Sequence, residues 1–97
     1  MVELIDVQKK QNELINIIKK QKELYTFIHE HEPGGCCWFG IRECDDKIDR
    51  NTKRQQKLPS LSGIQLESYM EFYNDILKVE RKELRELENY VKTKYNK

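Results

Sequence analysis

Residues 4–28 read LIDVQKKQNELINIIKKQKELYTFI, and this stretch carries the strongest indication of fold in the chain. Its large side chains recur at alternating spacings of three and four residues, which is the pattern of a helix with one buried face. The stretch holds no glycine or proline, and the first helix breaker after it is Pro33. The pattern predicts a helix over residues 2–31 whose buried face comprises Leu4, Val7, Gln11, Leu14, Ile18, Gln21, Tyr25 and Ile28.

The same spacing returns in the last third of the chain. Ser62 and Gln65 have the spacing of a capping box, which marks the start of a helix. The pattern predicts a helix over residues 63–95 whose buried face comprises Met70, Tyr73, Leu77, Glu80, Leu84, Leu87 and Val91. Further apolar residues flank both faces, which makes them wider than the seam of a two-stranded coiled coil.

Two long helices in so short a chain point to an all-α fold. We expect one helical domain over residues 1–97, built as a long, coiled-coil-like antiparallel helical hairpin with a shorter middle helix. A chain of 97 residues buries only a modest core, so we expect self-association, most simply into a homodimer with a four-helix bundle at its centre. The residues expected at this oligomer interface are Leu14, Ile18, Tyr25, Met70, Tyr73, Leu77 and Leu84.

Three residues on the two repeating faces are polar, namely Gln11, Gln21 and Glu80. Because wide helix faces leave some positions near solvent, we expect these residues at the edge of the bundle. The alternative is that they fix the register between helices, as single polar core residues do in coiled coils.

Residues 33–58 join the two long helices. They begin with PGGCCWFG over residues 33–40, and a weaker helical pattern follows from Ile41. Asn51 and Gln55 interrupt this pattern, so we expect a short helix that frays after Arg50, or alternatively a mobile linker.

Trp38 and Phe39 are the most distinctive residues of this middle region. Aromatic residues beside glycines either fold back to close the open end of the helix pair or stay exposed as anchors for a partner. We expect the first outcome, because a small bundle needs its large apolar groups. Basic residues follow them, and the residues predicted to contact a partner are Trp38, Phe39, Arg42, Arg50, Arg54 and Lys57.

The same region carries the side chains that zinc prefers, although their spacing is poor. The weak candidates for metal ligands are His29, His31, Cys36, Cys37 and Cys44. Cys36 and Cys37 are adjacent, whereas zinc sites present paired ligands two to four residues apart. We therefore expect no metal and no other cofactor, and we interpret the thiols as small buried apolar groups.

The sequence contains no motif for catalysis, neither a phosphate-binding glycine loop nor a nucleophile elbow. We expect no enzyme and no catalytic residue, but a small non-enzymatic protein-binding module that occludes or regulates a larger protein. The alternatives are a zinc-binding or a nucleic-acid-binding helical hairpin. A net charge of +1 does not favour nucleic acid.

Composition also bears on where the protein works. No apolar run approaches the ~20 residues that cross a bilayer, and no signal peptide is visible, so we expect a cytoplasmic protein without membrane contact. The chain contains no alanine, which indicates an AT-rich coding genome and suits an accessory or inhibitor protein of a bacterium or its phage.

Overall fold

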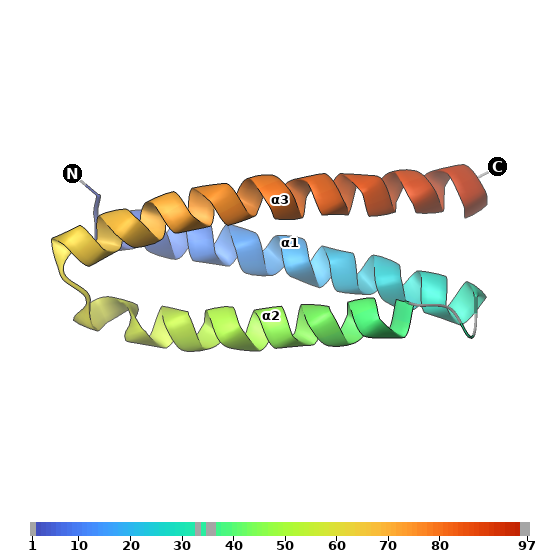
Figure 1. Cartoon of the computed structure of the whole chain (residues 1–97), viewed down its shortest axis with the longest axis horizontal. Helices are drawn as coiled ribbons and strands as arrows, with labels where there is room; N and C mark the ends of the chain where they lie inside the picture. Colours follow the sequence, from blue (N-terminus) through green and yellow to red (C-terminus); the bar gives the residue numbers. More distant parts are fainter. Residues whose placement is uncertain (1, 33, 35–36, 96–97) are drawn as a thin grey trace.

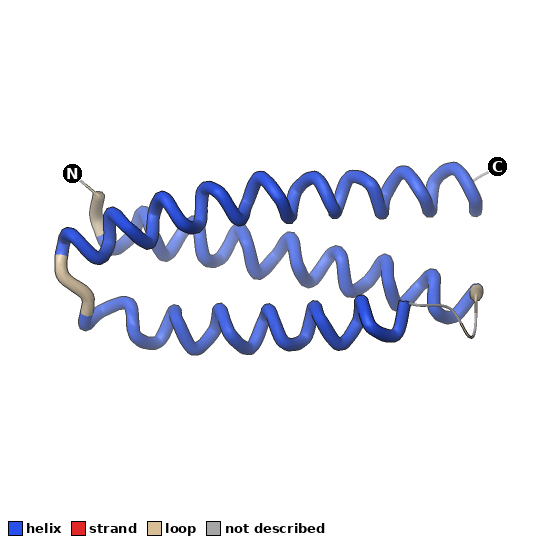
Figure 2. Tube along the Cα trace, viewed as in Figure 1, coloured by secondary structure: helices blue, strands red, loops and turns tan. Residues whose placement is uncertain are grey.

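A computed structural model describes residues 2–32, 34 and 37–95 of the chain. Within these ranges the elements are α1 (Leu4–His31), α2 (Cys37–Lys57), the 3-10 turn η1 (Leu58–Ser60) and α3 (Gly63–Tyr95). The described residues contain no strand (Figures 1 and 2). The predicted all-α class is confirmed, with a middle helix shorter than the two that flank it.

The helix α1 packs against both α2 and α3 (Figure 1). Antiparallel packing is found between α1 and α2, whereas the two long helices α1 and α3 run parallel. Hydrogen-bonded pairs show the parallel register, because Gln11 pairs with Tyr73 and, further along both helices, Tyr25 pairs with Glu83. The expectation that the long helices themselves lie antiparallel is corrected. The reason is the length of α2, which carries the chain back along α1 before α3 begins.

The helix α2 does not fray after Arg50 but continues to Lys57. The polar residues that interrupt its pattern find partners. Nδ2 of Asn51 donates to the carbonyl oxygen of Lys47 at 2.7 Å, and Nε2 of Gln55 donates to Oδ1 of Asn12 on α1 at 2.8 Å. The first bond lies within α2, and the second joins α2 to α1 beyond Arg50.

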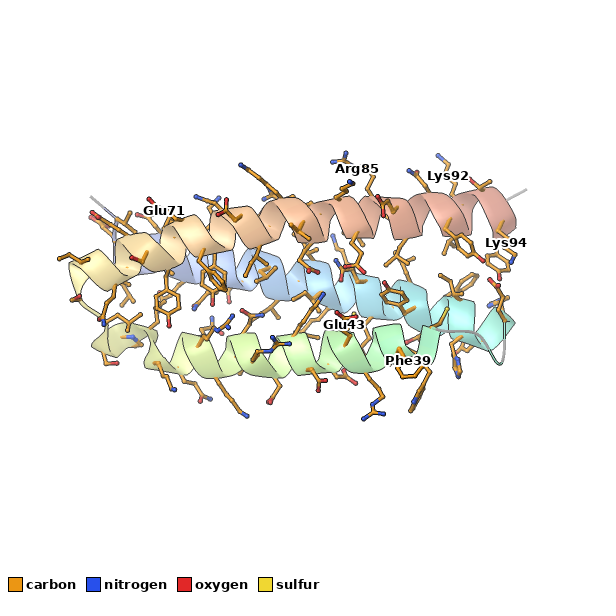
Figure 3. The ribbon with its side chains drawn as sticks, in the orientation of Figure 1. Phe39, Glu43, Glu71, Arg85, Lys92 and Lys94 are labelled. Carbon is orange, nitrogen blue, oxygen red and sulfur yellow. The ribbon has the colours of Figure 1, made fainter. Side chains whose placement is uncertain are left out.

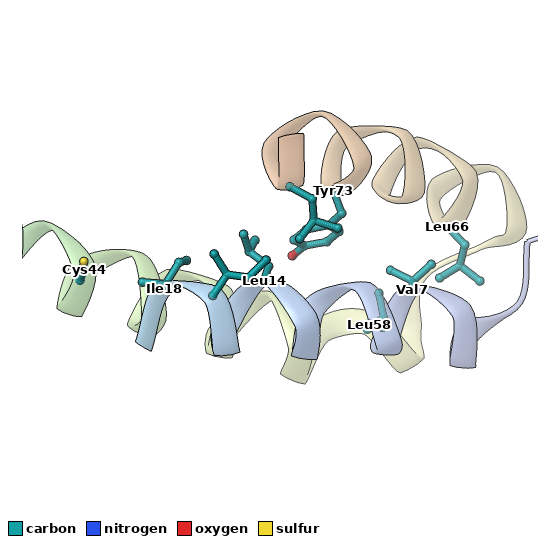
Figure 4. Close-up of a cluster of buried hydrophobic side chains, with 9 residues drawn as sticks. Val7, Leu14, Ile18, Cys44, Leu58, Leu66 and Tyr73 are labelled. Atoms are coloured by element: carbon teal, nitrogen blue, oxygen red, sulfur yellow. The ribbon is translucent and has the colours of Figure 1, made fainter. Parts of the chain in front are cut away.

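The hydrophobic core lies along α1 and takes side chains from all three helices (Figure 4). Val7, Leu14 and Tyr73 are 0 % exposed, and Leu58 of η1 closes the core near the start of α1. Full burial of one such side chain stabilises a fold by about 1.5–3 kcal/mol.

The residues expected at an oligomer interface belong to this intramolecular core instead. Leu14, Ile18, Tyr73 and Leu77 are at most 1 % exposed. Tyr25, Met70 and Leu84 pack against the same cluster. These side chains find their partners inside one chain because α2 and α3 both pack against α1. Any contact between copies has to use another surface.

The polar residues of the two seams are buried, not placed at the edge of the bundle. Gln11 and Gln21 are 0 % exposed and Glu80 is 6 % exposed. Nε2 of Gln21 donates to the carbonyl oxygen of Glu80 at 2.8 Å, and Nζ of Lys47 donates to Oε1 of Glu80 at 3.0 Å. Sliding one helix by a turn would break these bonds, so the polar layer favours one register.

The far ends of α1 and α3 are held together through Glu32. Its carboxylate accepts hydrogen bonds from Tyr90 at 2.8 Å and from Lys94 at 2.9 Å, and also from Tyr95. The bonds from Tyr95, Lys94 and Tyr90 lower the pKa of Glu32 to about 2. At the other end, Ser62 and Gln65 form the capping box that starts α3, with Ser62 N donating to Gln65 Oε1 at 2.8 Å.

Candidate protein-binding site on α2

Trp38 and Phe39 lie exposed in the first turn of α2, which we call the α2 tip. Trp38 is 52 % exposed and Phe39 is 72 % exposed. Figure 3 shows Phe39 directed away from the other helices. The expectation that both rings close the end of the bundle is therefore corrected. Rings from α1 and α3 occupy this end, because Phe27 packs edge to face on Tyr95 with 5.3 Å between ring centroids.

Gly40 brings the start of α2 close against α1. A Cβ atom at this position would lie 2.6 Å from Cδ1 of Tyr25, so no larger residue fits without a shift. The hydroxyl of Tyr25 donates to Oε1 of Glu83 on α3 at 2.7 Å. Burial and then this bond to Glu83 raise the pKa of Tyr25 above its usual range. Gly40, Tyr25 and Glu83 thus join all three helices beside the α2 tip. This contact holds the backbone that carries Trp38 and Phe39 in a fixed position.

The four basic residues predicted to contact a partner all lie on α2, and most of their charge faces water. Arg42, Arg50 and Lys57 are exposed, and Arg54 is half-buried with its guanidinium 5.1 Å from the ring centroid of Phe72. Within the residues that the structure describes, none of the four takes part in an ion pair.

The predicted contact residues fall into two groups along α2. Trp38, Phe39 and Arg42 lie within about one and a half turns, while Arg50, Arg54 and Lys57 follow two or more turns later. The structure thus does not bring the six residues into one compact patch. The first group combines exposed apolar area with a cation, which is the composition of a binding hot spot.

A cavity of about 170 Å³ adjoins the second group, between α2 and α3. Arg50 and Arg54 line it together with Phe72, which the sequence did not single out, and with Asn51, which stood out only as an interruption of the helical pattern. Glu80 lines it too, and Oδ1 of Asn51 and Oε2 of Glu80 are buried without a hydrogen-bond partner in the described part of the protein. Both residues stand at positions where the helical pattern calls for an apolar side chain, so the sequence marks them as unusual although it does not place them together.

The four weak metal candidates that lie in the described residues are not brought together. His29 lies beside Trp38, whereas Nδ1 of His31 lies 2.8 Å from the carbonyl oxygen of Phe27. Cys44 is 2 % exposed, and burial raises the pKa of its thiol to about 11. Cys37 is half-buried, and Cys36 lies outside the described residues. Across residues 2–32, 34 and 37–95, no group of three His, Cys, Asp or Glu side chains could hold a metal ion.

Comparison with protein-family models, with curated proteins and with solved structures finds no match to this chain. The described residues also form no helix that is long and apolar enough to cross a membrane. The geometry of α2 is therefore the starting point for a functional proposal.

Proposed function

We propose that the protein is a small non-enzymatic protein-binding module that occludes or regulates a larger protein partner. Its contact residues are the α2 tip, Trp38 and Phe39, and the adjacent Arg42, with Arg50, Arg54 and Lys57 extending the contact along α2. The absence of alanine suits an accessory or inhibitor protein of a bacterium or its phage.

The exposure of Phe39 beside Trp38 is the observation that carries this proposal. A chain with so small a core gains by burying every large ring, yet these two remain more than half exposed. Gly40 fixes their helix against Tyr25, so the rings stand on a preorganised support. A rigid support lowers the entropy lost on binding, and exposed aromatic rings beside Arg are typical anchors of protein interfaces.

A comparative capture experiment tests the proposal. The full chain is immobilised and exposed to lysate of its source cell, in parallel with Trp38→Ser, Phe39→Ser and the control Ile5→Ser. Ile5 is also exposed, at 53 %, but it lies in the first turn of α1. The proposal is supported if the wild type and Ile5→Ser retain a larger protein that both tip variants lose. This protein should also bind the purified chain with a 1:1 end point.

The proposal fails if the tip variants retain the same proteins as the wild type, or if no protein is enriched over a blank surface. Circular dichroism of each variant checks that the helices are intact. Because Trp38 and Phe39 are exposed, their replacement by serine leaves the core unchanged.

A further inference from the structure

The outer face of α3 carries six exposed charges in a regular order. Their spacings of four, four, three, four and three residues place them on one face of the helix. Figure 3 shows two of them, Glu71 and Arg85, directed away from α1. The charge stripe, as we call this set, holds three acids followed by three bases: Glu67, Glu71, Asp75, Lys78, Lys82 and Arg85.

Within one chain this order is mostly unfavourable. Glu67 and Glu71 are like charges four residues apart, as are Glu71 and Asp75, and each such pair weakens an isolated helix. Lys78 and Lys82 are also like charges four residues apart, here both positive. No ion pair within the described residues includes any member of the charge stripe. The like charges of the stripe are therefore not offset by ion pairs in this part of the chain.

The stripe is complementary to itself when two copies of α3 lie antiparallel. The midpoint between Asp75 and Lys78 is also the midpoint between Glu71 and Lys82, and it lies within one residue of the midpoint between Glu67 and Arg85. A two-fold axis at this point places every acid of one copy opposite a base of the other. When two identical helices pair antiparallel, each side of one helix faces the identical side of the other. The charge stripe of one copy can therefore face the charge stripe of the second copy.

Exposed apolar side chains adjoin the stripe on the side toward α2. Phe72 is 41 % exposed and Val79 is 64 % exposed, and they lie seven residues apart on one face of α3. Their midpoint falls within one residue of the same axis. In the antiparallel pair, Phe72 of one chain therefore meets the partner's Val79, which adds a buried apolar contact to the charge pairs.

We propose that the outer face of α3 is a homodimer interface in which two chains pair antiparallel about a two-fold axis near Ile76 and Leu77. The charge order selects this occupant. An unrelated partner would have to present the same sequence of charges in reverse, whereas a second copy presents it by symmetry. Phe39 of the α2 tip points away from this face (Figure 3), so binding of a partner at the tip and dimerisation use different surfaces, and Arg54, whose guanidinium lies over Phe72, adjoins both.

Charge-reversal variants test the interface by sedimentation equilibrium. Glu71→Lys with Asp75→Lys makes the stripe predominantly positive, and Lys78→Glu with Lys82→Glu makes it predominantly negative. We expect the wild type to dimerise and each variant alone to have a dimer Kd raised about tenfold or more, because attraction becomes repulsion. An equimolar mixture of the two variants should form a heterodimer. A single chain that carries all four reversals should form a homodimer again.

Recovery of the dimer on mixing shows that each variant alone lost its charge complementarity and not its fold, since two misfolded chains would not dimerise when mixed. A matched control reverses Glu88→Lys, an exposed charge of α3 outside the stripe, and should leave the dimer Kd unchanged. The proposal is overturned by a wild type that is monomeric at all soluble concentrations, by dimerisation that survives either double reversal, or by a mixture that stays monomeric.

Discussion

Lys47 on α2 and Glu80 on α3 form an ion pair with 3.0 Å between Nζ and Oε1, and their side chains are only 22 % and 8 % exposed. The pair joins two helices that otherwise pack mainly on α1. Burial by itself would lower the pKa of Lys47, but the bond to Glu80 and the nearby Glu83 and Glu43 raise it above its usual value. Lys47 thus stays charged in the folded protein.

Removing Lys47 should cost more than removing a surface lysine. Lys47→Met leaves the Glu80 carboxylate buried without its cation, so we expect the free energy of unfolding to fall by about 2–3 kcal/mol. Replacing both partners, Lys47→Met with Glu80→Leu, should recover most of this loss. Urea denaturation followed by circular dichroism measures both effects. The control is Lys53→Met, whose pair with Asp49 is exposed and whose replacement should cost less than about 1 kcal/mol. If Lys47→Met and Lys53→Met lowered the free energy of unfolding equally, the buried ion pair between Lys47 and Glu80 would be contradicted.

Gly40→Ala should destabilise the protein although alanine is the better helix former. The added methyl would meet the ring of Tyr25 at 2.6 Å, and the required shift should lower the free energy of unfolding by about 2 kcal/mol. Gly63 begins α3, and a Cβ atom there would have no neighbour within 4 Å, so Gly63→Ala is the matched control. We expect that change to be neutral or to stabilise by up to about 1 kcal/mol, by the same urea titration. A stable Gly40→Ala protein would disprove the close approach.

Cys44 should be protected from alkylation in the folded protein. Its thiol is 2 % exposed, and burial raises its pKa from 9.0 to about 11, so little reactive thiolate is present near neutral pH. A variant with Cys36→Ser and Cys37→Ser leaves Cys44 as the only thiol. We expect iodoacetamide to modify this variant slowly in buffer and rapidly in urea, as followed by mass spectrometry. Equal rates in both conditions would place Cys44 at the surface.

Acid should loosen the contact between the ends of α1 and α3. The pKa of Glu32 falls from 4.5 to about 2 on folding, so its bonds to Tyr95, Lys94 and Tyr90 contribute stability above pH 4.5. This contribution is lost as the pH falls from 4.5 towards 2. Thermal melting over this range should show a smaller pH dependence for Glu32→Gln than for the wild type. Glu30→Gln, an exposed neighbour, should behave like the wild type. Identical curves for Glu32→Gln and wild type would refute the contact.

The sequence was sufficient for the two long helices, but not for the length of α2 or for the directions in which the helices pack. Periodicity at Leu14 and Tyr73 shows which face of each helix is buried, and this follows from local geometry. It does not say whether the partner helix runs parallel or antiparallel. That choice depended on α2 persisting beyond Arg50, where Gln55 of α2 bonds Asn12 of α1, a residue far away in sequence.

The candidate site was predictable in its residues but not in its exposure. Trp38 and Phe39 stand out by residue type beside glycine. Whether they close the bundle depends on which other rings reach its end, and Tyr95 is separated from them by most of the chain. The buried role of Gln21 has the same origin, because its partner Glu80 lies on α3.

The central position of α1 also sets an order of assembly. The antiparallel packing of α1 and α2 needs only a short connection, so we expect this pair to associate early and with little loss of loop entropy. The parallel packing of α3 on α1 requires the whole intervening helix to be in place. Ribosomal synthesis delivers the elements in this same sequence. The helix α3 thus docks onto a surface that α1 and α2 have already formed, and the face on which the charge stripe lies is defined only once α3 has docked.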